Sequence, residues 1–396
     1  MSIQSTVRKD WDYLQAAVEL SREFATNAVE RDREGGNAFA ELEKLRESGL
    51  LKLNIPTEFG GFGKPWSAVM QVIREFAKVD GSFAHLFGYH CLNMTIVHLT
   101  GTPEQAARLY TETANNNWFW GNANNSLDRR VVGRENGDHY VLNGIKGFTS
   151  GSPYADILLI SFRDQSNEDI FHRAVIPAER QGVIVHNDWD AIGQRQTGSG
   201  TLSYQDAIVH KSELIDETYR KGTVLSTFPP ILAQLVLSNL FVGSAQGAIA
   251  EAAQYTRTQS RPWVTSGVER ANEDPIIIRQ YGELGIELEA AVSLVDRAIV
   301  QVDKAYAQGF DMTAEERGEA GYIVTTANVF SGNASLNICS RVFEVMGARA
   351  SANKYGFDRF WRNVRTHTLH NPAEYKVLTA GHYVLNGQLP RPGIFS

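Results

Sequence analysis

Patterns typical of helices occupy both ends of this chain, and patterns typical of strands occupy its middle. Between about residues 10 and 116 apolar side chains recur at helical spacing. Two helices are expected over 66–79 and 83–99. A further helix is expected from Pro103, because proline suits the first helical position and Thr102 stands where the N-cap belongs. The N-terminal part of the chain is therefore predicted to be helical.

The pattern changes after residue 118 to short β-branched and aromatic runs separated by polar turns. Polar turn residues between 134 and 144 predict a β-hairpin. Strands are also expected over 155–162, 174–179 and 201–210. Because this stretch contains no crossover helix, a β-barrel or sandwich is favoured over a parallel sheet.

Long amphipathic patterns return after residue 229. Helices are expected over 232–258, 276–309 and 313–346, and such lengths are typical of a four-helix bundle. We therefore predict an α+β fold with three domains: an N-terminal helical domain (1–116), a middle β domain (117–226) and a C-terminal helical bundle with a tail (227–396).

Composition excludes several classes of protein and site. The net charge of −7 argues against a nucleic-acid partner, because phosphate binding needs a basic surface. Two cysteines are too few for a disulfide scaffold or a thiolate zinc site. The segment 1–15 lacks the apolar core of a signal peptide, and the most apolar stretch, 231–243, is too short to span a membrane. We expect a cytoplasmic protein that binds neither nucleic acid nor membranes.

Several common catalytic motifs are absent. No G-x-G-x-x-G follows a predicted strand and opens a helix, and neither the P-loop, the H-E-x-x-H motif nor the G-x-S-x-G motif occurs. His367 and His370 are three residues apart, a spacing that suits metal ligands on a helix, but no carboxylate stands at matching spacing. We therefore predict no metal site and no nicotinamide-binding domain.

Four blocks of sequence resemble the acyl-CoA dehydrogenase superfamily, and together they span nearly the whole chain. They are YVLNGIKGFTSGSPYADILLI (140–160), IGQRQTGSGTLSYQDAIVHKSELI (192–215), YTRTQSRPW (255–263) and FEVMGARA (343–350). The first two are similar to the flavin-facing β domain of that family, and the last two to its flavin-phosphate positions. The resemblance implies an acyl-CoA dehydrogenase-like fold that binds a flavin.

The chain departs from the dehydrogenases at the residue that removes the substrate proton. Many members of the family carry Glu-Gly there, but this chain has Asn371 and Pro372, and an amide is no general base. In some branches the base stands on an earlier helix. The matching segment 281–289 contains Glu283, Glu287 and Glu289, which have the pattern of a solvated helix face. Dehydrogenation is therefore disfavoured.

Four other segments resemble the flavin-dependent monooxygenases of the same fold, the branch that includes dibenzothiophene and methanesulfinate monooxygenases. These segments are 85–90, 116–124, 187–197 and 356–372. The resemblance implies a two-component enzyme, in which a separate NAD(P)H-dependent reductase supplies reduced FMN, with FAD as a second possibility. A C4a-hydroperoxide of the flavin, formed with O2, would oxygenate the substrate.

The resemblance also assigns residues to the site. His370 and His85 would lie at the reactive edge of the flavin, where an imidazole can donate or accept a proton. Tyr89 would share the helix face of His85, whereas His90 is expected to be structural. Catalytic roles are implied for His370, His85, Ser150, Tyr89 and Asn122, and flavin contacts for Asn122, Ser150, Trp189, Ser199, Arg261, Arg349 and His370.

The implied substrate is a small organosulfur compound whose sulfur keeps a lone pair. Methanesulfinate, in sulfur assimilation, is the first expectation, a dibenzothiophene-type thioether the second and an amine the third. Phe119, Trp120, Phe148 and Trp263 are candidates to line the pocket, and the tail 386–396 to cover it or to contact another subunit. The resemblance also implies that Arg261 or Arg349 reaches the flavin of a neighbouring subunit. We therefore expect a homo-oligomer, with a tetramer as the favoured state. Two other classes stay open: an FAD-dependent acyl-CoA dehydrogenase with a relocated base, and a flavin-binding subunit without chemistry.

Overall fold

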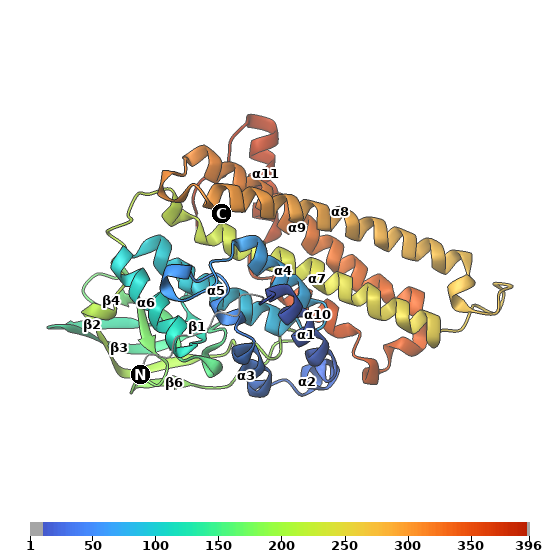
Figure 1. The fold of residues 1–396 in the computed structure, drawn as a ribbon, viewed down its shortest axis with the longest axis horizontal. Helices are drawn as coiled ribbons and strands as arrows, with labels where there is room; N and C mark the ends of the chain where they lie inside the picture. Colours follow the sequence, from blue (N-terminus) through green and yellow to red (C-terminus); the bar gives the residue numbers. More distant parts are fainter. Residues whose placement is uncertain (1–10, 394–396) are drawn as a thin grey trace.

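The computed structural model describes residues 11–393, and α-helices form its N-terminal part (Figure 1). These helices are α1 (Tyr13–Ala25), α2 (Ala28–Glu34), α3 (Phe39–Glu47), α4 (Trp66–Ala77), α5 (Gly81–Thr100) and α6 (Pro103–Asn116). Helices α4, α5 and α6 confirm the three that the sequence predicted. The Thr102 side chain caps α6 by accepting a hydrogen bond from the backbone N–H of Gln105 at 3.2 Å. Helix α5 is central, since all its residues except His98 are buried.

One seven-stranded sheet follows, at the left end of the molecule in Figure 1. Its strands are β1 (Trp120–Ala123), β2 (Val132–Asn136), β3 (His139–Lys146), β4 (Ile157–Asp164), β5 (Phe171–Pro177), β6 (Val183–Val185) and β7 (Leu202–His210). The pairing order is β1-β4-β2-β3-β7-β6, with β5 antiparallel to β4. Strands β1 and β2 both run parallel to β4, and β2 and β3 form the predicted hairpin. The expected β domain is therefore one curled, mixed sheet around a core of its own, which includes Leu142, Ile160 and Val209.

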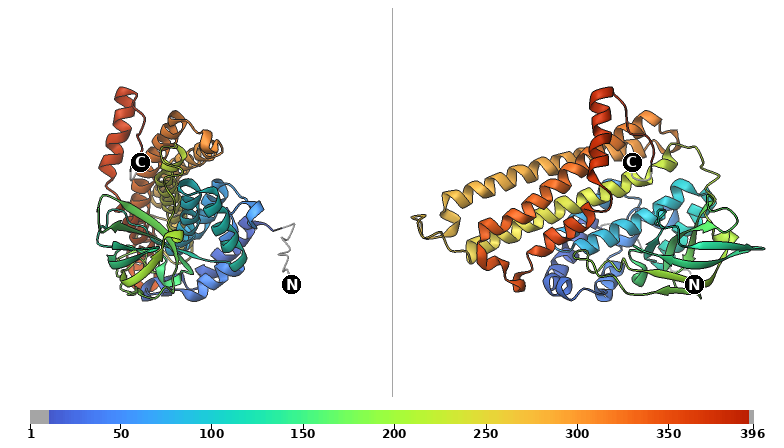
Figure 2. Two further views of the ribbon diagram at one scale, coloured as in Figure 1. Left: turned by 90° about the vertical axis from the view of Figure 1, so that its left-hand side faces the viewer. Right: turned by 180° about the vertical axis from the view of Figure 1, so that it is seen from behind.

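Three long helices form the C-terminal part and run side by side along the molecule (Figure 2). They are α7 (Pro229–Thr258), α8 (Pro275–Tyr306) and α9 (Ala314–Met346), followed by α10 (Asp358–Thr368) and α11 (Ala373–Asn386). The three long helices confirm the predicted bundle. By length and composition α7 is the one helix within residues 11–393 that is able to cross a membrane, but 89% of its apolar window is buried in the protein.

Glycines on α7 let the N-terminal helices pack directly on the bundle. A Cβ atom at Gly247 would stand 2.0 Å from the Lys78 carbonyl oxygen, and one at Gly243 would stand 2.5 Å from that of Arg74. Both carbonyls lie at the end of α4, so any larger side chain would push α4 off α7. The N-terminal helices and the bundle consequently share one apolar core.

The described part of the tail, up to residue 393, returns to its own bundle. Pro390 is buried, and Leu389 packs on Gly318 of α9. The Arg317 guanidinium donates to the Pro390 carbonyl at 3.4 Å and to the Thr227 carbonyl at 3.1 Å. Expectations about residues 394–396 and the first ten residues lie outside the described part of the chain.

Candidate functional site

Three aromatic side chains stack in a column between α5 and α10. The His85 ring lies 4.2 Å from the Tyr89 ring and 4.6 Å from the His367 ring, centroid to centroid, with interplanar angles of 29° and 24°. His85 and Tyr89 share one face of α5, as their spacing predicts. Both ring nitrogens of His85 and the Nε2 atom of His367 are buried without a hydrogen-bond partner. Buried polar atoms are normally paired, so these nitrogens are free to meet a ligand.

His370 lies just beyond α10, and its backbone N–H donates to the His367 carbonyl at 3.1 Å. Burial, with a smaller effect of the nearby His370, lowers the pKa of His85 to about 3. Burial, together with His85 and His370, holds the pKa of His367 well below its usual range. The ring of His370 reaches the surface of the single chain, but the protein packed around it and the Lys376 ammonium lower its pKa too. At neutral pH this cluster therefore holds uncharged imidazoles, which can both donate and accept protons.

A second cluster, of hydroxyl groups, lies where the turn after β3 meets the loop 193–200. The Ser150 and Ser199 hydroxyls are 2.7 Å apart, and Ser199 is also 2.7 Å from the Thr197 hydroxyl. The backbone N–H of Asn122 donates to the Ser150 carbonyl at 2.8 Å, and that of Gly151 donates to the Thr197 carbonyl at 2.8 Å. The structure thus brings together Asn122, Ser150 and Ser199, three of the predicted residues.

The two clusters meet at the first turns of α5. A Cβ atom at Gly151 would lie 3.4 Å from the Leu86 side chain, which follows His85. A Cβ atom at Gly193 would lie 2.1 Å from the Arg362 carbonyl, so the loop 193–200 also lies against α10. The histidine column and the hydroxyl cluster therefore border one region between sheet, α5 and α10.

Trp189 stands at the outer side of this loop. Its indole N–H donates to the Gln194 carbonyl at 2.8 Å, and its ring lies 6.1 Å edge-on from the Phe148 ring. A cavity of about 60 Å³ lies beside it, lined by Thr149, Gly198 and Thr201 among others. A hollow of about 760 Å³ lies elsewhere, between β5 and residues 211–226, and contains none of the predicted site residues.

The structure separates Arg261 and Arg349 from these clusters within one chain. Both are exposed, and Arg349 donates to the Gln259 carbonyl at 3.0 Å. The connection between α7 and α8, which carries Arg261, lies at the end of the bundle remote from the sheet (Figure 1). Their predicted phosphate contacts would therefore have to be made to another subunit.

The aromatic residues proposed for the pocket divide into core and surface. Phe119 and Trp120 are fully buried: Phe119 stacks on His90 at 5.4 Å, and the Trp120 indole donates to Thr113 at 2.9 Å. Both pack in the core between α5 and β1, so their place in the substrate pocket stays a prediction. His90 is structural, as expected, since its ring also bonds the Leu51 carbonyl at 2.8 Å. Phe148 and Trp263 are exposed.

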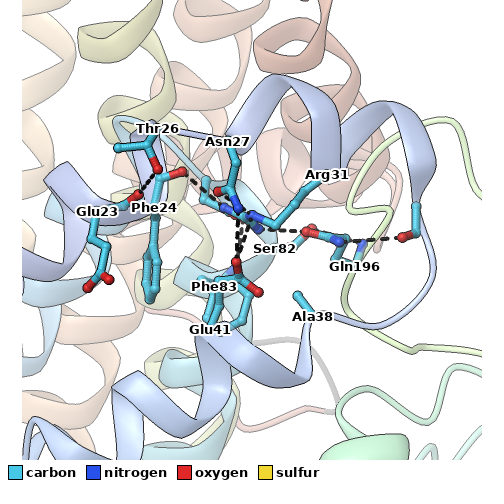
Figure 3. Close-up of polar contacts among 12 residues, drawn as sticks. Glu23, Phe24, Thr26, Asn27, Arg31, Ala38, Glu41, Ser82, Phe83 and Gln196 are labelled. Carbon is cyan, nitrogen blue, oxygen red and sulfur yellow. Dashed lines mark hydrogen bonds and ion pairs between the residues drawn. The ribbon is translucent and has the colours of Figure 1, made fainter.

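A buried arginine holds the hydroxyl loop against α5 (Figure 3). Arg31 on α2 is 7% exposed, and one of its Nη atoms bonds Asp80 at 2.6 Å and the Gln196 side chain at 2.7 Å. Asp80 also caps α5 by accepting from the Phe83 N–H at 3.0 Å. Arg31 further donates to Asn27 at 2.9 Å and lies 3.4 Å from a Glu41 oxygen. The network joins α2, α3, the start of α5 and the loop that carries Ser199.

The prediction missed His367 as a partner of His85, and it missed Arg31. His367 had a signal, since its spacing from His370 is unusual, but that spacing pointed to a metal. No group of three or more His, Cys, Asp or Glu side chains arranged to hold a metal ion occurs among the residues the structure covers. The position of Arg31 had no sequence signal, because an arginine on an amphipathic helix is normally exposed.

The chain is similar to known proteins over nearly its whole length. Models of the acyl-CoA dehydrogenase N-terminal, middle and C-terminal domains match residues 14–117, 121–207 and 235–374. A dibenzothiophene monooxygenase of Mycolicibacterium goodii is 44% identical, over 97% of this chain and 96% of its own. The probable FMNH2-dependent monooxygenase SfnC of Pseudomonas putida is 43% identical over 97% of each chain.

Two solved structures are similar over nearly their full length. The methanesulfinate monooxygenase MsuC of Pseudomonas fluorescens superposes with a TM-score of 0.95 at 45% identity, covering 97% of this chain and 99% of that one. FMN-bound TdsC of Paenibacillus sp. A11-2 superposes with a TM-score of 0.92 at 38% identity, covering 97% and 100%. Butyryl-CoA dehydrogenase of Megasphaera elsdenii, at 17% identity and a TM-score of 0.81, shares the fold.

The buried histidines predict a loss of stability in mild acid. Below about pH 6.5 the unfolded chain binds protons that folded His85 and His367 bind only at much lower pH, so the free energy of unfolding falls as pH falls. Each such histidine contributes at most about 1.4 kcal/mol per pH unit. Urea unfolding between pH 6.5 and 5 is expected to show a shallower pH dependence for His85→Leu. The exposed-residue variant His382→Asn should keep the wild-type slope, and an unchanged slope in His85→Leu would contradict the argument.

Proposed function

Since this chain belongs to the acyl-CoA dehydrogenase family, in its branch of flavin-dependent monooxygenases, we propose that it uses reduced FMN and O2 to oxygenate the sulfur of a small organosulfur compound. Two relatives of known name support this assignment, one acting on dibenzothiophene and one on methanesulfinate. We propose an alkanesulfinate such as methanesulfinate as the substrate, in sulfur assimilation. The second candidate function, for an enzyme of the same fold, is oxygen transfer to a thioether or an amine.

The observation that carries the proposal is a site of uncharged imidazoles where a dehydrogenase needs a carboxylate. Asn371, at the position of the dehydrogenase base, is buried and cannot remove a proton. Two of the three glutamates of the earlier helix have partners on the bundle surface, and the third, Glu289, is exposed. Glu283 pairs with Arg341 and Arg279 at 2.8 Å each, and Glu287 accepts from Asn337 at 2.7 Å. Neither Glu283 nor Glu287 is therefore free to act as the missing base, which disfavours the acyl-CoA dehydrogenase alternative.

The residues present fit a flavin. Ser150, Ser199 and Thr197 supply adjacent hydroxyls, and the Trp189 ring offers a flat apolar surface beside them. The unpartnered nitrogens of His85 and His367, in the adjoining cluster, offer further donors and acceptors. Bound reduced FMN would supply the electrons that activate O2.

The protein's own part is to position the reactants, to move a proton and to keep water out. His370 would transfer the proton at its ring nitrogen, since an imidazole does this readily near neutral pH. The Tyr89 hydroxyl would stay protonated and donate a hydrogen bond, because burial raises the Tyr89 pKa to about 12. The packed column of Tyr89, His85 and His367 limits access of water, which protects the activated oxygen.

The proposal includes partners. A separate flavin reductase would supply reduced FMN in the cytoplasm, as the description of SfnC as FMNH2-dependent suggests. We also propose a homotetramer in which Arg261 or Arg349 reaches the flavin phosphate of a neighbouring subunit. Exposed apolar side chains support such assembly, since exposed patches of this kind mark protein interfaces. They include Tyr375, Leu378, Val384 and Leu385 on α11 and Ile276, Ile278 and Ile286 on α8.

Turnover with labelled oxygen tests the proposal. The purified protein, chemically reduced FMN and ¹⁸O2 are mixed with methanesulfinate, dibenzothiophene or an amine, and products are analysed by mass spectrometry. We expect one ¹⁸O atom in the oxygenated product of at least one sulfur compound. Oxidation of the flavin without any oxygenated product would contradict the monooxygenase and favour a flavin-binding subunit. Reduction of bound FAD by an acyl-CoA would favour the dehydrogenase.

A further inference from the structure

Lys376 is a partly buried cation next to the candidate site, and its two hydrogen-bond acceptors are neutral amides. It lies in the first turn of α11, six residues after His370. Its Nζ donates to Oδ1 of Asn328 on α9 at 2.6 Å and to Oε1 of Gln234 on α7 at 2.7 Å. Within residues 11–393 it forms no ion pair, so no carboxylate compensates its charge.

The two amides that hold Lys376 are themselves fixed. The Asn328 side-chain amide donates to the Gln234 carbonyl and to the Ser238 hydroxyl, both at 3.1 Å, and Ser238 donates back to the Gln234 carbonyl at 2.8 Å. Gln234, Ser238 and Asn328 are all buried. The ammonium therefore has a defined position, with two of its three N–H groups used and a third left for a ligand.

This ammonium lies beside the end of α10, where the histidine cluster is. A Cβ atom at Gly332, one turn after Asn328 on α9, would touch Thr368 at 3.3 Å. The charge of Lys376 is also close enough to His370 to lower the pKa of its ring. Lys376 and His370 therefore border the same region.

Lys376 carries a positive charge in that region, whereas the neighbouring side chains of the histidine cluster are neutral. His85, His367 and His370 are uncharged at neutral pH, and Tyr89 stays protonated. Burial lowers the pKa of Lys376 to about 8, so the amine is still largely charged at neutral pH. Partial removal of an ammonium from water without a counter-ion carries a cost, and an anion that bound beside it would offset that cost.

We infer that Lys376 is the residue that selects an anionic substrate, by donating its third N–H to an oxygen of an alkanesulfinate. The inference rests on the proposed function and narrows it to a substrate class. A sulfinate carries its charge on two oxygens and its lone pair on sulfur, so an ammonium can hold the oxygens while the sulfur faces the flavin. A neutral thioether gains nothing from this contact.

Two substrates and two variants test the inference. Lys376→Met removes the charge at similar size, and Lys376→Arg keeps it. We expect Lys376→Met to raise KM for methanesulfinate by about 10–100-fold, the effect of losing a hydrogen bond to a charged group. Its KM for neutral ethyl phenyl sulfide should stay within about twofold, and Lys376→Arg should recover part of the loss. The exposed-lysine variant Lys211→Met, remote from the site, should change neither value.

Direct binding separates this inference from the proposed function. Calorimetry of methanesulfinate with the FMN-loaded protein is expected to show binding that Lys376→Met weakens and Lys376→Arg partly restores. If the wild type oxygenates only neutral sulfides, the inference is wrong and the monooxygenase stands. If nothing is oxygenated but sulfinate binding depends on Lys376, the proposed function is wrong and the anion site stands. Equal losses for both substrates, or no change, would show that Lys376 only fastens α11.

Discussion

Replacing His370 by alanine is expected to lower the rate of product formation by about 10²–10⁴-fold, the range typical of a lost general acid or base. His370 lies at the surface end of the histidine cluster, and its lowered pKa keeps the ring uncharged at neutral pH. It is therefore the member of the cluster that can exchange protons with solvent. The measurement is single-turnover product formation with reduced FMN, O2 and substrate, together with the ratio of product to hydrogen peroxide.

A matched control separates chemistry from folding. His382→Ala removes an exposed histidine on α11, outside the cluster, and should leave rate and product ratio unchanged. His370→Ala should retain the wild-type unfolding midpoint, since exposed side chains contribute little to stability. If His370→Ala turned over substrate at the wild-type rate, the predicted role of His370 in proton transfer would be wrong. The stacked pair of His85 and His367 would then be the better candidate.

Replacing Arg31 by methionine is expected to lower the free energy of unfolding by about 3–5 kcal/mol, because one partner of a buried ion pair is removed. Asp80 would remain buried with its charge uncompensated, and the Gln196 side chain would lose a donor. The same change frees the loop that carries Ser199, so FMN binding should weaken as well. Urea unfolding and FMN titration at neutral pH measure the two effects.

A double-mutant cycle sharpens this prediction. Adding Asp80→Asn to Arg31→Met should recover part of the lost stability, since the uncompensated charge is then gone. The exposed pair of Arg270 and Glu273 provides the control, and Arg270→Met should change the free energy of unfolding by about 1 kcal/mol or less. A loss below about 1 kcal/mol in Arg31→Met would show that the network is not tightly packed.

The helices and strands were largely predictable because their signals are local. Apolar spacing marked α7, α8 and α9, and the Thr102-Pro103 pair marked the start of α6. Polar turns marked the hairpin of β2 and β3. The parallel pairing of β1 and β2 with β4 had no comparable signal, because a pairing partner is chosen by the path of the chain and not by the strand's own residues.

The family resemblance supplied candidate residues for the site, but not their geometry. Resemblance to a family pointed to His85, His370, Ser150 and Ser199, and the structure brings these into two adjoining clusters. It did not show that His367 stacks on His85, nor that Lys376 is held by two amides. Phe119 and Trp120 carried the apolar character of a pocket, and the structure places both in the core, which leaves their pocket role a prediction.

The sequence by itself determined the order of helical, strand and helical parts, the family and the presence of Asn371 and Pro372 where many dehydrogenases carry Glu-Gly, since each depends on residue identity and local periodicity. Only the tertiary structure decided which distant side chains meet. His85 and His367 are 282 residues apart in the chain and 4.6 Å apart in space, and Arg31 meets Gln196 across 165 residues. Such contacts depend on where packed helices and loops cross, and the packing of the whole core fixes those crossings.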